Sequence, residues 1–89
     1  MTEERFIEIM ESDTDIKAPT WKGCNVVSGL KIITKYLPEK GIEGAEHDIV
    51  YSVNTSELIK AGITEEDAIK LRKLNWMIDE YGEGLACFV

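Results

Sequence analysis

The stretch from Ser56 to Val89, SELIKAGITEEDAIKLRKLNWMIDEYGEGLACFV, decides the fold class of this chain. A short helix comes first and ends at Gly62, because glycine most readily adopts the left-handed conformation that follows a helix. A second helix begins at Thr64, the first residue of TEED, whose hydroxyl can cap it. Past Asn75 the helical spacing stops, and the apolar runs WMIDE and LACFV flank the turn sequence YGEG. The stretch therefore predicts two short helices followed by a β-hairpin.

A strand precedes these two helices. Residues 47–53, HDIVYSV, alternate between two sides and are rich in β-branched and aromatic residues. Asn54 follows as a helix N-cap, and Glu57 three positions later gives the form of a capping box. The run PEKGIEGAE at residues 38–46 holds one proline and two glycines, which predicts a loop.

Two further helices are predicted before that loop. Within residues 25–37, apolar side chains recur at helical spacing, namely at Val26, Leu30, Ile33 and Leu37. Asn25 is the predicted N-cap of this helix, and the small Ser28 and Gly29 within it let another part of the fold pack close. Residues 2–12 form the earlier helix, with acids crowded into its first turns, and residues 13–23 form a loop.

The chain is thus predicted to be a single α+β domain, residues 1–89, with the element order ααβααββ. We expect a small antiparallel sheet of about three strands, with helices packed on one face. Alternation along LACFV places Phe88 and either Leu85 or Val89 in the core. If this strand lies at the edge of the sheet, its backbone can pair with a second copy of the chain.

The balance of charge excludes some partners. The chain has 89 residues and a net charge of −7, with 44% hydrophobic and 30% charged residues, as in globular domains. An acidic surface repels phosphate, so we expect no nucleic-acid partner. No apolar run approaches the roughly 20 residues that span a bilayer, and the acidic N-terminus MTEERFIEIMESD is unlike a signal peptide. We therefore expect a cytoplasmic protein with no membrane partner.

Few residues have the chemistry of an active site. His47 is the only histidine, and Cys24 and Cys87 lie too far apart in sequence for a CxxC motif or metal spacing. We expect both cysteines to be free thiols, and the pKa of Cys87 to be raised by its apolar surroundings. The sequence therefore predicts no catalytic, cofactor-binding or metal-binding residue and no cofactor. A cysteine–histidine enzyme built on His47 and Asp48 stays as the least favoured alternative.

Two resemblances accompany these patterns. The segment with Leu58, Ala61-Gly62-Ile63-Thr64 and Leu71 resembles the turn of helix-hairpin-helix and sterile-alpha-motif domains. Backbone amides of the helix-hairpin-helix turn bind DNA phosphates, whereas here three acids follow Thr64 and would repel them.

The segments HDIVYS, AGITEEDAIKLRKLNWMIDE and LACFV together resemble small acidic uncharacterised proteins of bacteria and their phages. That resemblance implies no activity, site or cofactor.

The function expected from the sequence is a non-enzymatic protein-interaction role, with a protein partner or a homodimer. The alternative is an acidic inhibitor of a basic partner, of the nucleic-acid-mimicking or immunity type. Sixteen of the seventeen acids lie outside residues 16–40, so the acidic surface itself could block such a partner.

Overall fold

The computed structural model describes residues 1–11, 24–79 and 81–88. Its helices are α1 (Glu3–Met10), α2 (Asn25–Tyr36), α3 (Thr55–Lys60) and α4 (Glu65–Lys73). Its strands are β1 (Gly44–Glu46), β2 (Ile49–Asn54), β3 (Trp76–Ile78) and β4 (Gly84–Phe88). The loop predicted for residues 13–23 and the placement of Val89 lie outside the described residues.

The four strands form one antiparallel sheet in the order β1-β2-β4-β3. The α+β prediction is confirmed, but the expected three strands and the order ααβααββ are wrong, since β1 lies inside the predicted loop 38–46. The pair Glu46↔Ile49 closes a two-residue turn, in which His47 has a φ of 54°. His47 is thus a turn residue in front of β2 and lies outside the observed strand, although the strand predicted over residues 47–53 included it.

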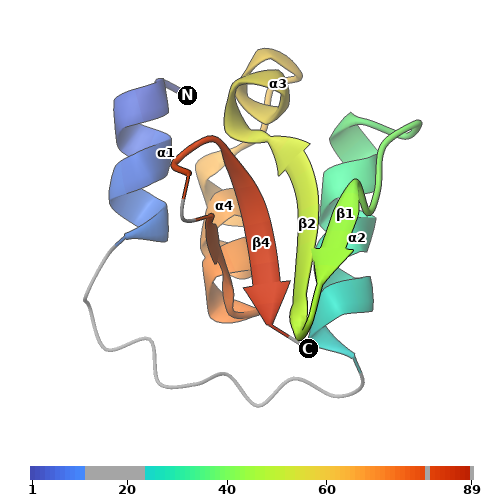
Figure 1. The fold of residues 1–89 in the computed structure, drawn as a ribbon. Coiled ribbons are helices and arrows are strands. Elements are labelled where there is room, and N and C mark those ends of the chain that lie inside the picture. Colours follow the sequence, from blue (N-terminus) through green and yellow to red (C-terminus); the bar gives the residue numbers. More distant parts are fainter. Residues whose placement is uncertain (12–23, 80, 89) are drawn as a thin grey trace.

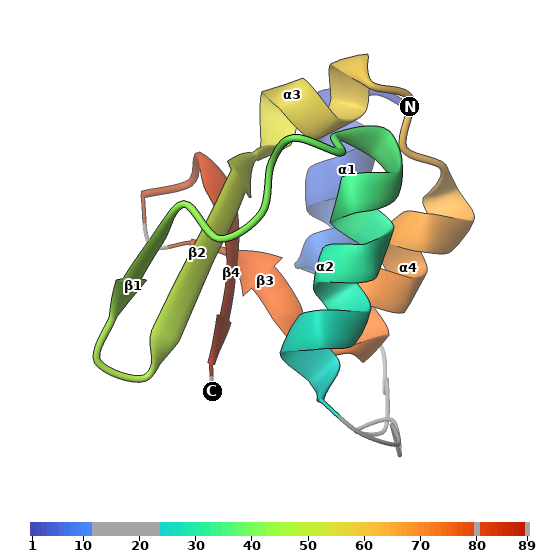
Figure 2. The same cartoon turned by 90° about the vertical axis from the view of Figure 1, so that its right-hand side faces the viewer.

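Strand β4 lies between β2 and β3, as Figure 2 shows. Pairing of β4 with a second copy of the chain was expected only if β4 were an edge strand. It is not, because its backbone is paired on both sides. The outer strands are β1 and β3, and each is only three residues long. Short outer strands offer little backbone for pairing with another chain.

The helices lie on one side of the sheet, as Figures 1 and 2 show from two directions. Leu85 and Cys87 point toward the helices and are fully buried, and the register places Cys87 opposite Trp76. The prediction that Phe88 lies in the core is wrong, because Phe88 follows Cys87 and must point to the opposite face. Its side chain is 47% exposed.

Side-chain caps define the short helices α3 and α4. Asn54 Oδ1 accepts a hydrogen bond from Ser56 N at 3.1 Å, and Thr64 Oγ1 accepts one from Asp67 N at 3.2 Å. Between the helices Gly62 has a φ of +93°. The N-caps predicted for these two helices and the glycine stop between them are therefore confirmed.

The predicted cap of α2 is wrong. Cys24 occupies the N-cap position and makes no side-chain cap bond, while Asn25 is the first residue of the helix. The side-chain nitrogen Nδ2 of Asn25 donates instead to the backbone carbonyl of Leu74 at 2.9 Å and to Sγ of Cys87 at 3.1 Å. A tertiary contact with the end of α4 and with β4 has replaced the local cap.

Replacement of Gly62 by alanine is expected to lower the free energy of unfolding by about 1 kcal/mol, because a Cβ disfavours the left-handed conformation. No atom lies within 4 Å of the added Cβ, so the cost comes from the backbone alone. Urea denaturation of the wild type and Gly62→Ala measures it. Gly62→Asn is the matched control and is expected to cost less, since asparagine tolerates this conformation. A stabilised alanine variant would contradict the glycine stop.

Candidate functional site

The face of the sheet opposite the helices is the candidate functional site. Register pairs Ile49 with Phe88, and it pairs Ala86 with both Tyr51 and Met77. Residues directly opposite each other in neighbouring strands share a face of the sheet. These five side chains therefore gather on the face turned toward the viewer in Figure 1, which no helix of the described residues covers. We call it the open face.

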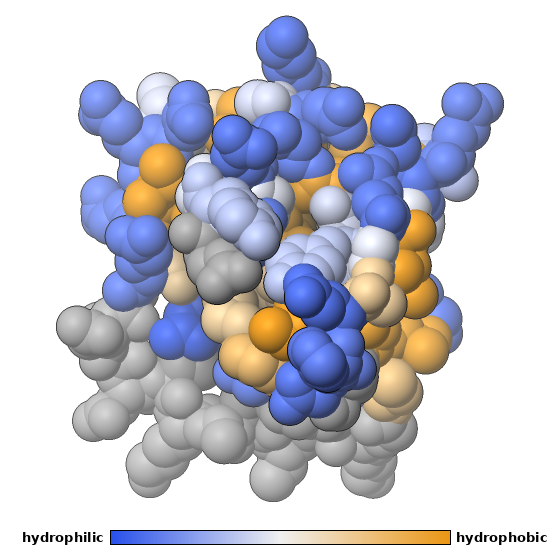
Figure 3. Space-filling model, in the orientation of Figure 1, coloured by the Kyte–Doolittle hydropathy of each residue, from blue (hydrophilic) through white to orange (hydrophobic). Residues whose placement is uncertain are grey.

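A shallow hollow of about 270 Å³ lies in the open face. Its lining comes from β2, β3, β4 and the residue after β3, namely Ile49, Tyr51, Met77, Ile78, Asp79, Ala86 and Phe88. The short side chain of Ala86 lies between the larger Tyr51 and Met77, which explains why the face is hollowed here. Figure 3 shows apolar side chains reaching the surface between hydrophilic ones on this side of the molecule.

Asp79 contributes a carboxylate to the wall of the hollow. Asp79 Oδ1 accepts hydrogen bonds from Tyr81 N at 3.0 Å and Glu83 N at 3.2 Å, and Oδ2 accepts one from Gly84 N at 3.1 Å. These three bonds hold the turn between β3 and β4 against the hollow. Asp79 thereby places one negative charge at a defined position beside the apolar lining.

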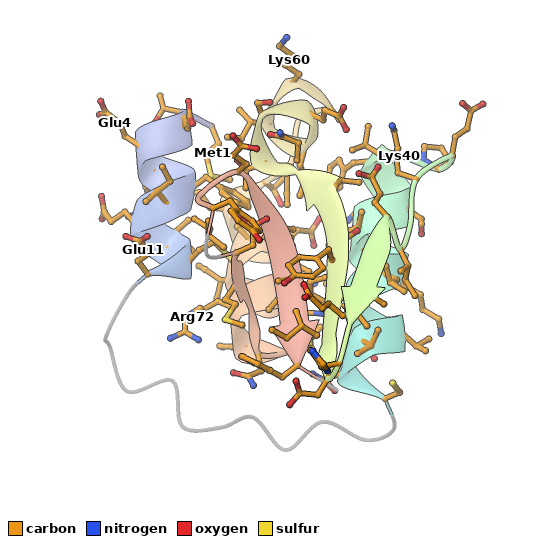
Figure 4. The ribbon with its side chains drawn as sticks, in the orientation of Figure 1. Met1, Glu4, Glu11, Lys40, Lys60 and Arg72 are labelled. Atoms are coloured by element: carbon orange, nitrogen blue, oxygen red, sulfur yellow. The ribbon has the colours of Figure 1, made fainter. Side chains whose placement is uncertain are left out.

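Three other acids lie in strand β1 and in the two turns next to the strands that line the hollow. Glu46 is exposed and lies opposite Ile49 in the register, so it shares the open face, and Asp48 and Glu83 are exposed in the two turns of the sheet. Among the described residues that line the hollow, none is basic. The labelled side chains of Lys40, Lys60 and Arg72 extend outward from the periphery of the molecule (Figure 4). The open face therefore combines an apolar centre with acids on the face and in its turns, namely Glu46, Asp48, Asp79 and Glu83, which we call the acidic surround.

The residues considered for thiol chemistry lie in separate environments. Cys24 is exposed and Cys87 is buried, and both are free. Burial raises the pKa of the Cys87 thiol, and the hydrogen bond from Asn25 opposes that rise only in part. His47 and Asp48 are exposed in the turn between β1 and β2, whereas Cys87 faces the helices. Across the described part of the chain, no group of three or more histidine, cysteine, aspartate or glutamate side chains could hold a metal ion.

A second cluster of titratable groups joins α2 to α4. The Asp67 side chain is 6% exposed, and its Oδ2 accepts hydrogen bonds from Lys35 Nζ at 2.5 Å and from the Tyr36 hydroxyl. Lys70 lies 3.9 Å from the other carboxylate oxygen. The bonds from Lys35 and Tyr36 lower the pKa of Asp67, against the opposing effect of burial. The cluster satisfies a buried charge at a helix contact, which is a structural role.

Acid is expected to remove the contribution of Asp67 to stability. The pKa of Asp67 is lower in the folded protein than its ordinary 3.8, so the stabilisation is complete above that value and falls away as pH drops below it. An asparagine side chain carries no charge, so Asp67→Asn is expected to cost about 1–3 kcal/mol at pH 7 and progressively less toward pH 3. Urea denaturation of both proteins across this range measures the difference, and a difference independent of pH would contradict the assignment.

The sequence contains a pattern that indicates an apolar open face, but the pattern does not show which side of the sheet is open. An antiparallel sheet with one solvated face normally alternates apolar and polar residues. Here Ile49-Val50-Tyr51 and Ala86-Cys87-Phe88 are apolar on both sides. Both faces of these strands are apolar, but the helices cover only one of them. The other apolar face is therefore left uncovered by helices.

In comparisons with family models, with curated proteins and with solved structures, the chain matches none of them. Of the helices in residues 1–11, 24–79 and 81–88, none has the length and apolarity needed to cross a membrane.

Proposed function

We propose that this chain is a non-enzymatic protein-interaction domain that binds its partner through the open face of its sheet. The observation that carries the proposal is the uncovered apolar face, with Phe88 47% exposed beside a hollow of about 270 Å³. Apolar patches rimmed by polar residues mark interaction sites on soluble proteins, because leaving them in water is unfavourable. A partner of another sequence and a second copy of this chain both fall within this proposal.

The geometry supports an enzyme less well. The Cys87 thiol is buried on the helix side with a raised pKa, and it accepts a hydrogen bond from the side chain of Asn25. A nucleophilic cysteine works as a thiolate, usually with a histidine in contact, and burial disfavours that form. Inhibition of a basic partner, which the acidic composition suggests, is a special case of the interaction role.

Site-specific photo-crosslinking tests the interaction role. A benzophenone amino acid replaces Phe88 in one variant and Val27 in the other, and each full chain is irradiated in its native cells. Val27 lies on α2 and is 50% exposed, so the two positions match in accessibility and differ in the face that they probe. We expect a discrete crosslinked product from position 88 that is missing from position 27.

The identity of the product comes from mass spectrometry. A product that contains either another protein or a second copy of this chain supports the interaction role. Identical products from both positions, or none from position 88, would contradict it. Circular dichroism of both variants confirms beforehand that the substitutions leave the fold intact.

A further inference from the structure

The size of the hollow indicates what kind of group it takes. Its volume of about 270 Å³ lies just below the roughly 300–1,000 Å³ of typical small-molecule sites. Among the described residues of the lining, the polar side-chain groups are the Tyr51 hydroxyl and the Asp79 carboxylate. The oxygens of Asp79 already accept three backbone hydrogen bonds from the β3–β4 turn. A single large apolar side chain fits such a hollow better than a polar cofactor, which would leave its own polar groups unsatisfied.

The charge around the hollow indicates what flanks that side chain. Asp79 lines the hollow, Glu46 shares the open face, and Asp48 and Glu83 are exposed in the adjoining turns. The chain as a whole carries a net charge of −7. Acidic groups of this kind attract lysine and arginine and repel carboxylates, and they act on encounter as well as on the bound state.

We propose that the hollow receives one leucine, methionine or phenylalanine side chain from a partner protein. In the partner's sequence, the residues next to this side chain are lysine or arginine. This inference rests on the proposed interaction role. The apolar side chain supplies the buried anchor, and the basic neighbours face the acidic surround. Hot spots of protein interfaces commonly have this arrangement, a buried apolar anchor with charges at the rim.

A second copy of this chain is the less suitable occupant. In a two-fold dimer the same patch lies on both sides of the interface. Glu46, Asp48 and Glu83 of both copies would then lie on or beside the same interface, with a net charge of −7 on each chain. Like charges placed opposite each other at an interface oppose association.

Titration of the isotope-labelled full chain with short peptides, followed by amide NMR shifts, tests the partner's chemistry. One peptide has a central phenylalanine flanked by lysines, a second has serine at its centre, and a third has glutamate flanks. We expect the first peptide to shift the amides of Ile49, Met77, Ala86 and Phe88. The serine peptide lacks the apolar anchor, and the glutamate peptide places like charges against the acidic surround. Each is expected to bind about tenfold more weakly or not detectably.

Rim variants give a second measurement. Glu46→Gln combined with Glu83→Gln is expected to weaken the lysine-flanked peptide several-fold. Glu4→Gln combined with Glu11→Gln, two acids that Figure 4 places on α1 and at its end, away from the open face, is expected to change nothing. The effect of the rim variant is also expected to shrink as salt is added, because ions screen exposed charges.

Several outcomes would overturn the inference. These are equal binding of the glutamate-flanked peptide, absence of shifts on the open face, or the same shifts arising from protein concentration alone. The last of these would identify a second copy as the occupant. If position 88 still crosslinks to a protein in cells, such a result overturns the basic partner and leaves the interaction role standing, so the two proposals fail separately.

Discussion

Removal of residues 87–89 is expected to unfold the domain. The deletion takes away the pairs of Phe88 with Ile49 and of Cys87 with Val50 and Trp76, so β4 loses partners on both sides. It also removes the fully buried Cys87. Each ladder hydrogen bond contributes about 0.5–1.5 kcal/mol net, and small domains hold about 5 kcal/mol at the low end of the natural range. The losses together approach that total.

Circular dichroism and thermal melting of the truncated chain measure this effect. Phe88→Ser in the full chain is the control, because Phe88 is 47% exposed on the open face and its backbone pairs remain. We expect this variant to lose about 1 kcal/mol or less, since only part of the side chain is buried. A truncated chain that melts as cooperatively and at as high a temperature as the full chain would contradict the inner position of β4.

Gly29→Ala is expected to destabilise the protein by about 2–4 kcal/mol, although the same change inside an ordinary helix stabilises by about 1 kcal/mol. A Cβ at Gly29 would lie 1.9 Å from Nε1 and 2.4 Å from Cε2 of Trp76, which is fully buried. The indole must then move, and its Nε1 loses the hydrogen bond that it donates to Asn25 O at 3.2 Å. A buried donor without a partner costs about 1–3 kcal/mol.

Urea denaturation compares Gly29→Ala with Gly41→Ala. No atom lies within 4 Å of a Cβ added at Gly41, and the backbone there is outside the left-handed region. We expect Gly41→Ala to match the wild type or to exceed it slightly, because alanine restricts the unfolded chain. An alanine at position 29 that leaves stability unchanged would show that α2 does not rest on the indole of Trp76.

The boundaries of α3 and α4 could be predicted from residues close by in the sequence. Asn54, Gly62 and Thr64 lie at the helix boundaries where their cap chemistry places them. The smallness of Gly29 also predicted a close contact, although Trp76 as the neighbour could not be foreseen, because the two residues are far apart in sequence. Caps and stops depend on residues within one or two turns, and a sequence displays them directly.

The candidate site could not be predicted in the same way. Strand β1 has only three residues, one of them Gly44, and it follows a loop that contains Gly41. It therefore carries no strand pattern in the sequence, and it is a strand because it pairs with β2. The prediction that Phe88 lies in the core was wrong by one residue, because Cys87 and not Phe88 faces the helices. Alternation shows which residues share a face but not which face is covered, and a shift by one residue exchanges the two.

The sequence by itself determined the α+β class, the caps of α3 and α4, the acidic balance and the lack of a recognisable metal or catalytic motif. Each of these depends on neighbours in the chain or on a count of residues. Only the tertiary structure decided that β4 is an inner strand, that Asn25 bonds to Cys87 and Leu74, and that Ile49, Tyr51 and Phe88 share an uncovered face. These features arise when distant segments pair, and the energy of pairing depends on partners that no local pattern specifies.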